Sequence, residues 1–182
     1  MAITLIQEDG TGLANANSYE DDAGAKAYME LTGRKTEWNA FSTQERLAAL
    51  IVATQFMDQT YRCRWLGDPV EATQDTQALD WPREGLFLPS GDPRPADPIP
   101  VEIAQGCAEY ALIAATSGIN PDPTYDPTGR SIREKTVRVE GAVSKKTVYD
   151  GGTTPVINRR YPAAEGVLRE FLTPSSRTLL RA

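Results

Sequence analysis

Residues 42–61 carry the sequence STQERLAALIVATQFMDQTY. Ser42 and Glu45, three residues later, match a capping box, in which each side chain accepts a hydrogen bond from the other residue's backbone N–H. The residues that follow with the spacing of one helix face are Leu47, Leu50, Ile51, Thr54, Met57 and Tyr61. This stretch predicts a long helix and therefore a helical core for the fold.

Two further helices are predicted on either side of this stretch. Ser18 can cap a helix, with Asp21 in the capping-box position, and the apolar stripe that follows ends at Gly33. Pro100 is favoured in a first helical turn and opens a second apolar stripe, which ends near Gly118. Three helices therefore make up the predicted core.

The hydrophobic pattern changes after a turn-rich linker at residues 120–129. Residues 137–140 and 143–149 alternate between side chains of different polarity, and Gly141 offers a turn between them. This pattern predicts a β-hairpin. Pro162 then opens a last short helix, because its fixed backbone angle suits a first helical turn.

The segment between residues 67 and 100 is rich in proline and glycine, which excludes long regular elements. It contains Trp81 and Phe87 and follows directly on Trp65, and leaving three large aromatic side chains in solvent would forgo about 1.5 to 3 kcal/mol of burial for each. We therefore expect an ordered excursion. The side chains expected to hold it against the helices are Trp65, Trp81, Pro82 and Arg83.

The length and composition indicate one folded body with appendages. The chain has 182 residues, of which 40% are hydrophobic and 24% charged. The expected fold class is mainly α: a small helical bundle with an inserted proline-rich loop, a β-hairpin, and a C-terminal helix plus extended arm. The expected division is a helical body with an N-terminal arm at residues 1–129, a hairpin extension at 130–160, and a C-terminal helix and arm at 161–182.

The N-terminal residues have neither the basic region nor the apolar run of a signal peptide, so we expect a cytoplasmic origin. The longest apolar run in a helical region, residues 47–52, is far shorter than the roughly 20 residues that cross a bilayer. We therefore expect no transmembrane segment.

Charge is distributed unevenly along the chain, although the net charge is only −6. From Arg130 onward there are eleven basic and five acidic residues, whereas the first 129 residues hold eight basic and twenty acidic ones. Opposite fields on one chain favour ordered contact with neighbours or with an acidic partner. The charge pattern therefore predicts an interaction surface in the C-terminal third.

The residues that commonly carry catalysis are scarce. The chain has no histidine, the commonest general base and metal ligand. Cys63 and Cys107 lack the spacing of a metal site, and we expect two buried free thiols rather than a disulfide. Residues 10–12 lack the lysine of a phosphate-binding loop, and residues 120–126 lack the spacing of a calcium loop. We expect neither an enzyme, a cofactor nor a metal.

The basic C-terminal third has two interpretations. Its cationic side chains could bind phosphates while nearby tyrosines stack on bases. The acidic main body and the lack of a recognisable nucleic-acid-binding fingerprint instead favour contact with proteins. Both interpretations stay open, and the residues concerned are Lys145, Lys146, Tyr149, Arg159, Arg160 and Tyr161.

Several short motifs together resemble a known family. They are Asn17-Ser18-Tyr19, Arg64-Trp65-Leu66-Gly67, the run from Gln77 to Gly85 that contains Trp81-Pro82-Arg83, and Ile99-Pro100-Val101-Glu102-Ile103-Ala104. In order and spacing they are similar to a phage and prophage family whose members are often labelled DnaT-like single-stranded DNA-binding proteins. Members also look like relatives of the head-to-tail adaptors of long-tailed phages.

This resemblance implies a structural protein of the phage neck, in which about twelve copies form a ring between the portal and the tail or next neck protein. Packaged DNA would pass through the ring without sequence-specific binding, and the protein would be found in the virion neck after assembly in the host cytoplasm. The residues expected to bind the portal are Arg177, Leu179, Leu180 and Arg181. Those expected between subunits are Arg138, Lys145, Lys146 and Tyr149.

Two other functions remain open. A DnaT-like accessory protein of replication would bind single-stranded DNA, and its affinity would fall steeply with salt. An enzyme would need a nucleophile, a base or a metal site, and no candidate for any of them stands out in the sequence.

Overall fold

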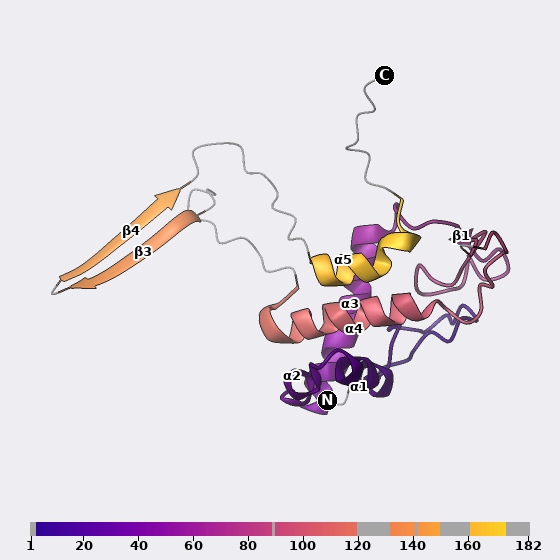
Figure 1. The fold of residues 1–182 in the computed structure, drawn as a ribbon, viewed down its shortest axis with the longest axis horizontal. Coiled ribbons are helices and arrows are strands. Elements are labelled where there is room, and N and C mark those ends of the chain that lie inside the picture. Colours follow the sequence, from indigo (N-terminus) through magenta and orange to yellow (C-terminus); the bar gives the residue numbers. More distant parts are fainter. Residues whose placement is uncertain (1–2, 89, 120–131, 141, 150–160, 174–182) are drawn as a thin grey trace, which may run out of the picture. The chain divides into compact units, whose positions relative to one another are not determined.

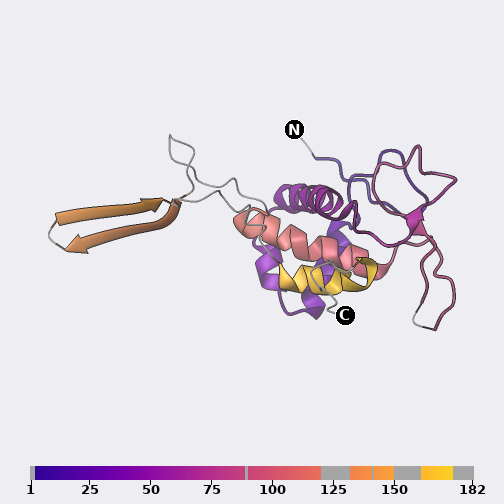
Figure 2. The ribbon, with the colours of Figure 1, turned by 90° about the horizontal axis from the view of Figure 1, so that it is seen from above.

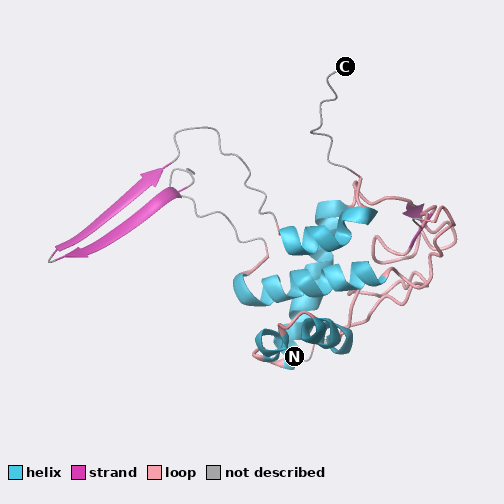
Figure 3. Cartoon of the chain, in the orientation of Figure 1, coloured by secondary structure: helices cyan, strands magenta, loops and turns pink. Residues whose placement is uncertain are grey.

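The long helix α3 spans Thr43–Tyr61 and begins at the predicted capping box. The Ser42 hydroxyl accepts a hydrogen bond from the Glu45 backbone N–H at 3.3 Å, and the Glu45 carboxylate accepts one from the Ser42 N–H at 2.7 Å. Helix α3 packs against α1 and α4 and buries side chains along most of its length. The prediction of this helix and of a mainly helical fold is confirmed (Figure 3).

The computed structural model places the chain in two compact units, which are described separately. The helical unit comprises residues 1–119 and 161–182, and the hairpin unit comprises residues 120–160. For the two strands of the hairpin unit, only the backbone is described. The residues that the structure describes are 3–88, 90–119, 132–140, 142–149 and 161–173.

Helix α1 spans Asp22–Leu31, and its cap differs from the predicted one. Asp21 caps the helix, because its carboxylate accepts a hydrogen bond from the Gly24 N–H at 2.7 Å. Ser18 is buried in extended backbone that pairs with Gln7, and its hydroxyl donates to the Glu20 carbonyl instead. Pairing with the N-terminal segment therefore moves the start of the helix to Asp22.

Helix α2, Lys35–Asn39, was not predicted. Five residues span little more than one helical turn, so they carry too short a periodic pattern to recognise. Its Trp38 is wholly buried, and the indole N–H donates to the Asp22 carboxylate at 3.2 Å. The helix therefore packs against α1 and adds a buried aromatic ring to the core.

Helix α4, Val101–Ser117, packs against α1, α3 and α5, which spans Pro162–Leu168 and continues into the short 3-10 helix η1, Arg169–Phe171 (Figures 1 and 2). A Cβ atom on Gly106 would lie 2.6 Å from the Leu168 side chain, so glycine permits the close approach of α4 and α5. The last helix, expected as part of a separate C-terminal segment, thus packs in the core of the helical unit.

The proline-rich excursion is tied down by two buried side chains. Trp81 is wholly buried and meets Trp65 and Phe171 edge to face, with ring centroids 5.6 and 5.5 Å apart. The Arg83 guanidinium donates to the carbonyl of Leu66 at 3.0 Å and to that of Gly67 at 2.6 Å. Beside these contacts, strand β1, Asp68–Pro69, pairs with strand β2, Arg83–Glu84.

The N-terminal segment, predicted as an extended arm, closes around a buried carboxylate. Glu8 is 1% exposed and accepts hydrogen bonds from the backbone N–H groups of Gly10, Gly12 and Leu13 at 2.8 to 3.0 Å. The Leu13 carbonyl then accepts a bond from the Ala78 N–H at 3.1 Å. Glu8 therefore organises the loop that joins the N-terminus to the excursion.

Glu8→Gln is expected to lower the free energy of unfolding by about 1 to 3 kcal/mol, because an amide N–H₂ would face the backbone N–H groups that now donate to the carboxylate. Urea denaturation at pH 7 measures the change. The control is Asp75→Asn, which also removes one carboxylate but at an exposed position, and should leave the midpoint nearly unchanged. Equal midpoints for the two variants would show that the Glu8 contacts do not stabilise the loop.

The hairpin unit contains the predicted β-hairpin, which is confirmed. Strand β3, Ile132–Glu140, pairs antiparallel with strand β4, Ala142–Tyr149. The ladder is irregular between Ile132 and Glu134 and regular from there to the turn.

Candidate nucleic-acid interface

The two units differ in the sign of their charge. The helical unit contains twenty acidic and eleven basic residues, whereas the hairpin unit contains five acidic and eight basic ones. Within the span from Ile132 to Tyr149, five residues are basic and two acidic. The strands of the hairpin are therefore the described segment in which positive charge is most concentrated.

The hairpin register brings the cationic positions predicted from the sequence into one ladder. Lys145 pairs with Val137, Lys146 with Thr136, and Arg138 with Ser144. Tyr149 pairs with Ile132 at the end of the ladder away from the turn. The four residues expected between subunits thus belong to one two-stranded ribbon. Because a strand rises about 3.3 Å per residue, the nine residues of β3 extend over roughly 30 Å.

Tyr161, considered from the sequence for stacking on bases, is occupied inside the helical unit. Its hydroxyl donates to the Ile119 carbonyl, and its ring packs edge to face against Phe56 and Tyr110, with centroids 5.9 and 5.7 Å away. Tyr161 is half-buried and held by these contacts, so it belongs to the packing of the helical unit rather than to the candidate interface.

Other candidates from the sequence lie outside the described residues. Arg159 and Arg160, considered for phosphate contact, fall in the segment 150–160. The residues expected to bind a portal also fall outside: Arg177, Leu179, Leu180 and Arg181.

The charged clusters of the helical unit bind its own helices together. The Arg34 guanidinium donates to both oxygens of Glu109, which is buried in α4, and the Tyr28 hydroxyl donates to the same carboxylate at 2.8 Å. The Arg46 guanidinium likewise donates hydrogen bonds to both carboxylate oxygens of Asp22, at 2.7 and 3.0 Å.

These two clusters hold the helices of the unit together and are not binding sites, because their carboxylate and guanidinium groups are already hydrogen-bonded to each other. Burial opposes ionisation of Asp22, but the bonds from Arg46 and Lys26 outweigh it and lower the pKa of that carboxyl to about 2. Burial also raises the pKa of Tyr28 to about 12, with a further contribution from Glu109. Asp22 is therefore ionised and Tyr28 neutral at pH 7.

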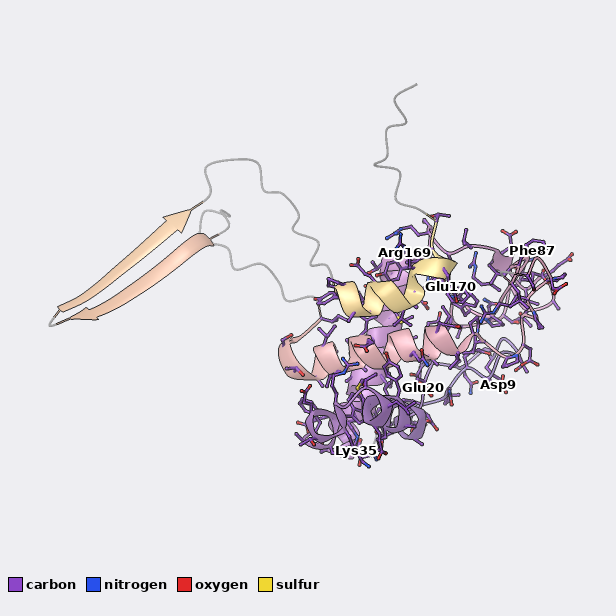
Figure 4. The ribbon with its side chains drawn as sticks, viewed as in Figure 1. Asp9, Glu20, Lys35, Phe87, Arg169 and Glu170 are labelled. Atoms are coloured by element: carbon purple, nitrogen blue, oxygen red, sulfur yellow. The ribbon has the colours of Figure 1, made fainter. Side chains whose placement is uncertain are left out.

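An open hollow lies between α4 and the α5–η1 segment, where Figure 4 labels Arg169 and Glu170. Two carboxylates on its border, Glu102 and Glu170, are paired with Arg94 at 3.0 and 3.7 Å. The charge of Arg94 is thus already paired, and the two carboxylates offset the charge of Arg169 on the same border, so the hollow offers little attraction to a phosphate.

The two cysteines are free, and only one of them is buried. Cys107 packs wholly inside the core, where burial raises the pKa of its thiol to about 11. Cys63 is exposed, so the prediction of two buried thiols is wrong for this residue, which lies just past the last turn of α3.

Across the described residues, no three metal-binding side chains gather in one place. In the same part of the chain, none of the helices combines the length and apolar character needed to cross a membrane.

Residues 3–182 match a family described as "Putative DnaT-like ssDNA binding protein". No curated protein and no solved structure gives a significant match. The family match overturns the predicted phage neck adaptor, which nothing here supports, and agrees with the single-stranded DNA binder that was kept as the alternative. The adaptor prediction was wrong because an acidic body with a basic arm fits a nucleic acid as well as a neighbouring subunit. Since the match covers nearly the whole length, the chain belongs to this DnaT-like family.

Proposed function

We propose that the protein binds single-stranded DNA through its hairpin unit, as a replication accessory that acts by binding rather than by catalysis. The observation that carries the proposal is the excess of basic residues in the β3–β4 ribbon of a chain that belongs to a DnaT-like family. The remainder of the chain supplies the fold that carries this unit.

Electrostatics favours the hairpin over the helical unit as the contact. Affinity for nucleic acid arises largely from neutralising phosphates with lysine and arginine. The helical unit has nine more acidic than basic residues, and its guanidinium groups on half-buried Arg34 and buried Arg46 are engaged with carboxylates. A DNA strand would therefore be repelled by the helical unit and attracted to the ribbon.

The chemistry available in the ribbon favours binding without strong sequence preference. Lysine acts as a flexible point charge and does not read base edges by a fixed geometry. Tyr149 is the aromatic residue within the paired strands, and stacking on an aromatic ring tolerates any base. We therefore expect similar affinity for different single-stranded sequences.

A salt titration of the full chain with a fluorescently labelled oligothymidylate tests the proposal. If the five basic positions of the ribbon each neutralise a phosphate, the logarithm of the affinity should fall with that of the salt concentration at a slope of about −3.5. Fluorescence anisotropy should then show a roughly 100-fold loss of affinity between 50 and 200 mM salt.

Two controls accompany this measurement. A mixed-sequence strand of the same length should bind with similar affinity, and a short oligomer of glutamate should compete only weakly, since it offers no bases to Tyr149. A protein that fails to bind the labelled strand at 50 mM salt and micromolar concentration does not have the proposed function.

A further inference from the structure

Two carboxyl groups approach each other under the Trp81–Pro82 segment. Asp58, on the last turn of α3, is 6% exposed, and its Oδ2 accepts a hydrogen bond from the Asp80 backbone N–H at 3.3 Å. Its Oδ1 accepts a hydrogen bond from the Tyr19 hydroxyl at 2.5 Å, and that hydroxyl oxygen in turn accepts one from the Trp81 backbone N–H at 3.3 Å. One carboxyl thus joins α3, the segment before α1 and the excursion.

Each oxygen of Asp58 has a neutral donor, whereas Asp80 has a donor at one oxygen only. Asp80 Oδ1 accepts from Arg62 Nε at 3.2 Å, but the buried Oδ2 forms no hydrogen bond among the described residues. The Trp65 indole N–H, which lies close enough to Asp80 to lower its pKa, forms none either. The Arg62 side chain is 68% exposed, so solvent screens its charge. The Arg83 guanidinium donates its hydrogen bonds to backbone carbonyls rather than to these carboxyl groups. A buried carboxylate oxygen without a donor is costly when ionised.

We propose that Asp58 and Asp80 form a proton-controlled latch, which holds the Trp81–Pro82 segment on α3 while the pair keeps one proton and loosens it when both groups ionise. The latch is independent of the proposed DNA binding, because it lies within the helical unit. Two neighbouring carboxyl groups in a buried site titrate as a coupled pair, and the second ionisation is the unfavourable one.

The direction of the pH effect follows from the geometry. Burial raises the pKa of Asp58 to about 7, with the charge of Asp80 adding to the effect and the bond from Tyr19 opposing it. Burial also raises the pKa of Asp80, against the attraction of Arg62 and Arg83. The unfolded chain loses the Asp58 proton near pH 4, whereas the folded chain keeps it up to about pH 7. Stability from this pair is therefore present at low pH and lost as pH rises to about 7.

The test compares the full chain with Asp58→Asn, and with Asp75→Asn as the control at an exposed position of the same excursion. Tryptophan emission of the native protein is followed from pH 5.5 to 8.5, because Trp81 lies directly on the latch. The urea midpoint is measured at both limits. The wild type and Asp75→Asn should show an emission change centred near pH 7 and a lower midpoint at pH 8.5. Asp58→Asn should lose the emission change and most of the fall in midpoint.

A second variant guards against misfolding of Asp58→Asn. Asp80→Asn removes the neighbouring charge that raises the pKa of Asp58, so the emission change should move to lower pH while the protein stays folded. The latch is excluded if the wild-type emission is flat across this range. It is equally excluded if Asp80→Asn leaves the centre of the emission change where the wild type has it.

Discussion

Replacing Lys135, Lys145 and Lys146 together by glutamine should weaken binding to single-stranded DNA about 100-fold at 0.1 M salt, since each lost phosphate contact costs roughly fivefold there. The slope of log affinity against log salt should also become less negative by about 2. The three lysines belong to the two paired strands of the hairpin unit, where positive charge is most concentrated. Fluorescence anisotropy at several salt concentrations measures both quantities.

The matched control neutralises three cations of the helical unit, Lys26, Lys35 and Arg169, which changes the net charge by the same amount. The lysine side chains are 42% and 53% exposed. Lys35 makes a surface ion pair, which contributes little to stability, and Asp22, the partner of Lys26, keeps its pairing with Arg46. Loss of the three cations should weaken binding less than threefold, through the long-range field alone. If the two triple variants weaken binding equally, the location of the charge is irrelevant and the hairpin is not the contact.

Trp81→Ala should lower the free energy of unfolding by about 3 to 5 kcal/mol, because it empties the space between two aromatic rings in a fully buried position. In a chain of this size the melting temperature should fall on the order of 10 °C. Thermal unfolding followed by circular dichroism measures the change. The described residues of the excursion form no long regular element, so its attachment depends on this side chain and on Arg83.

Phe87→Ala provides the comparison, since Phe87 is an aromatic residue of the same excursion that is 69% exposed (Figure 4). Its removal should change the free energy of unfolding by less than about 0.5 kcal/mol. A melting temperature of Trp81→Ala within a degree or two of the wild type would mean that the excursion is held by other contacts.

The elements predicted well from the sequence are those whose signals are local. The capping box at Ser42 and Glu45 lies within four residues, and both of its hydrogen bonds form as predicted. The alternation around Gly141 likewise predicted the β3–β4 pairing. The start of α1 was misplaced because the segment carrying Ser18 pairs with residues near Gln7, and that pairing competes with a helix cap.

The function was harder to predict from the residues than the fold. Counting charges located the basic third of the chain, but a charge excess does not distinguish a phosphate backbone from an acidic protein surface. The family match favours the phosphate backbone, and the structure adds that Tyr161 packs against aromatic side chains of its own unit. The position of the candidate interface was thus predictable, while its partner was not.

What the sequence alone determined is helices α1, α3, α4 and α5, the hairpin and the separation of charge, because caps, periodicity and net charge are properties of short segments. Only the tertiary structure decided which acidic side chains are buried. Asp58 is 39 residues from Tyr19 and 22 from Asp80, and Glu8 turns inward among loop N–H groups. Burial and the loss of water depend on segments that meet only when the chain has folded, so no local pattern marks these carboxyl groups.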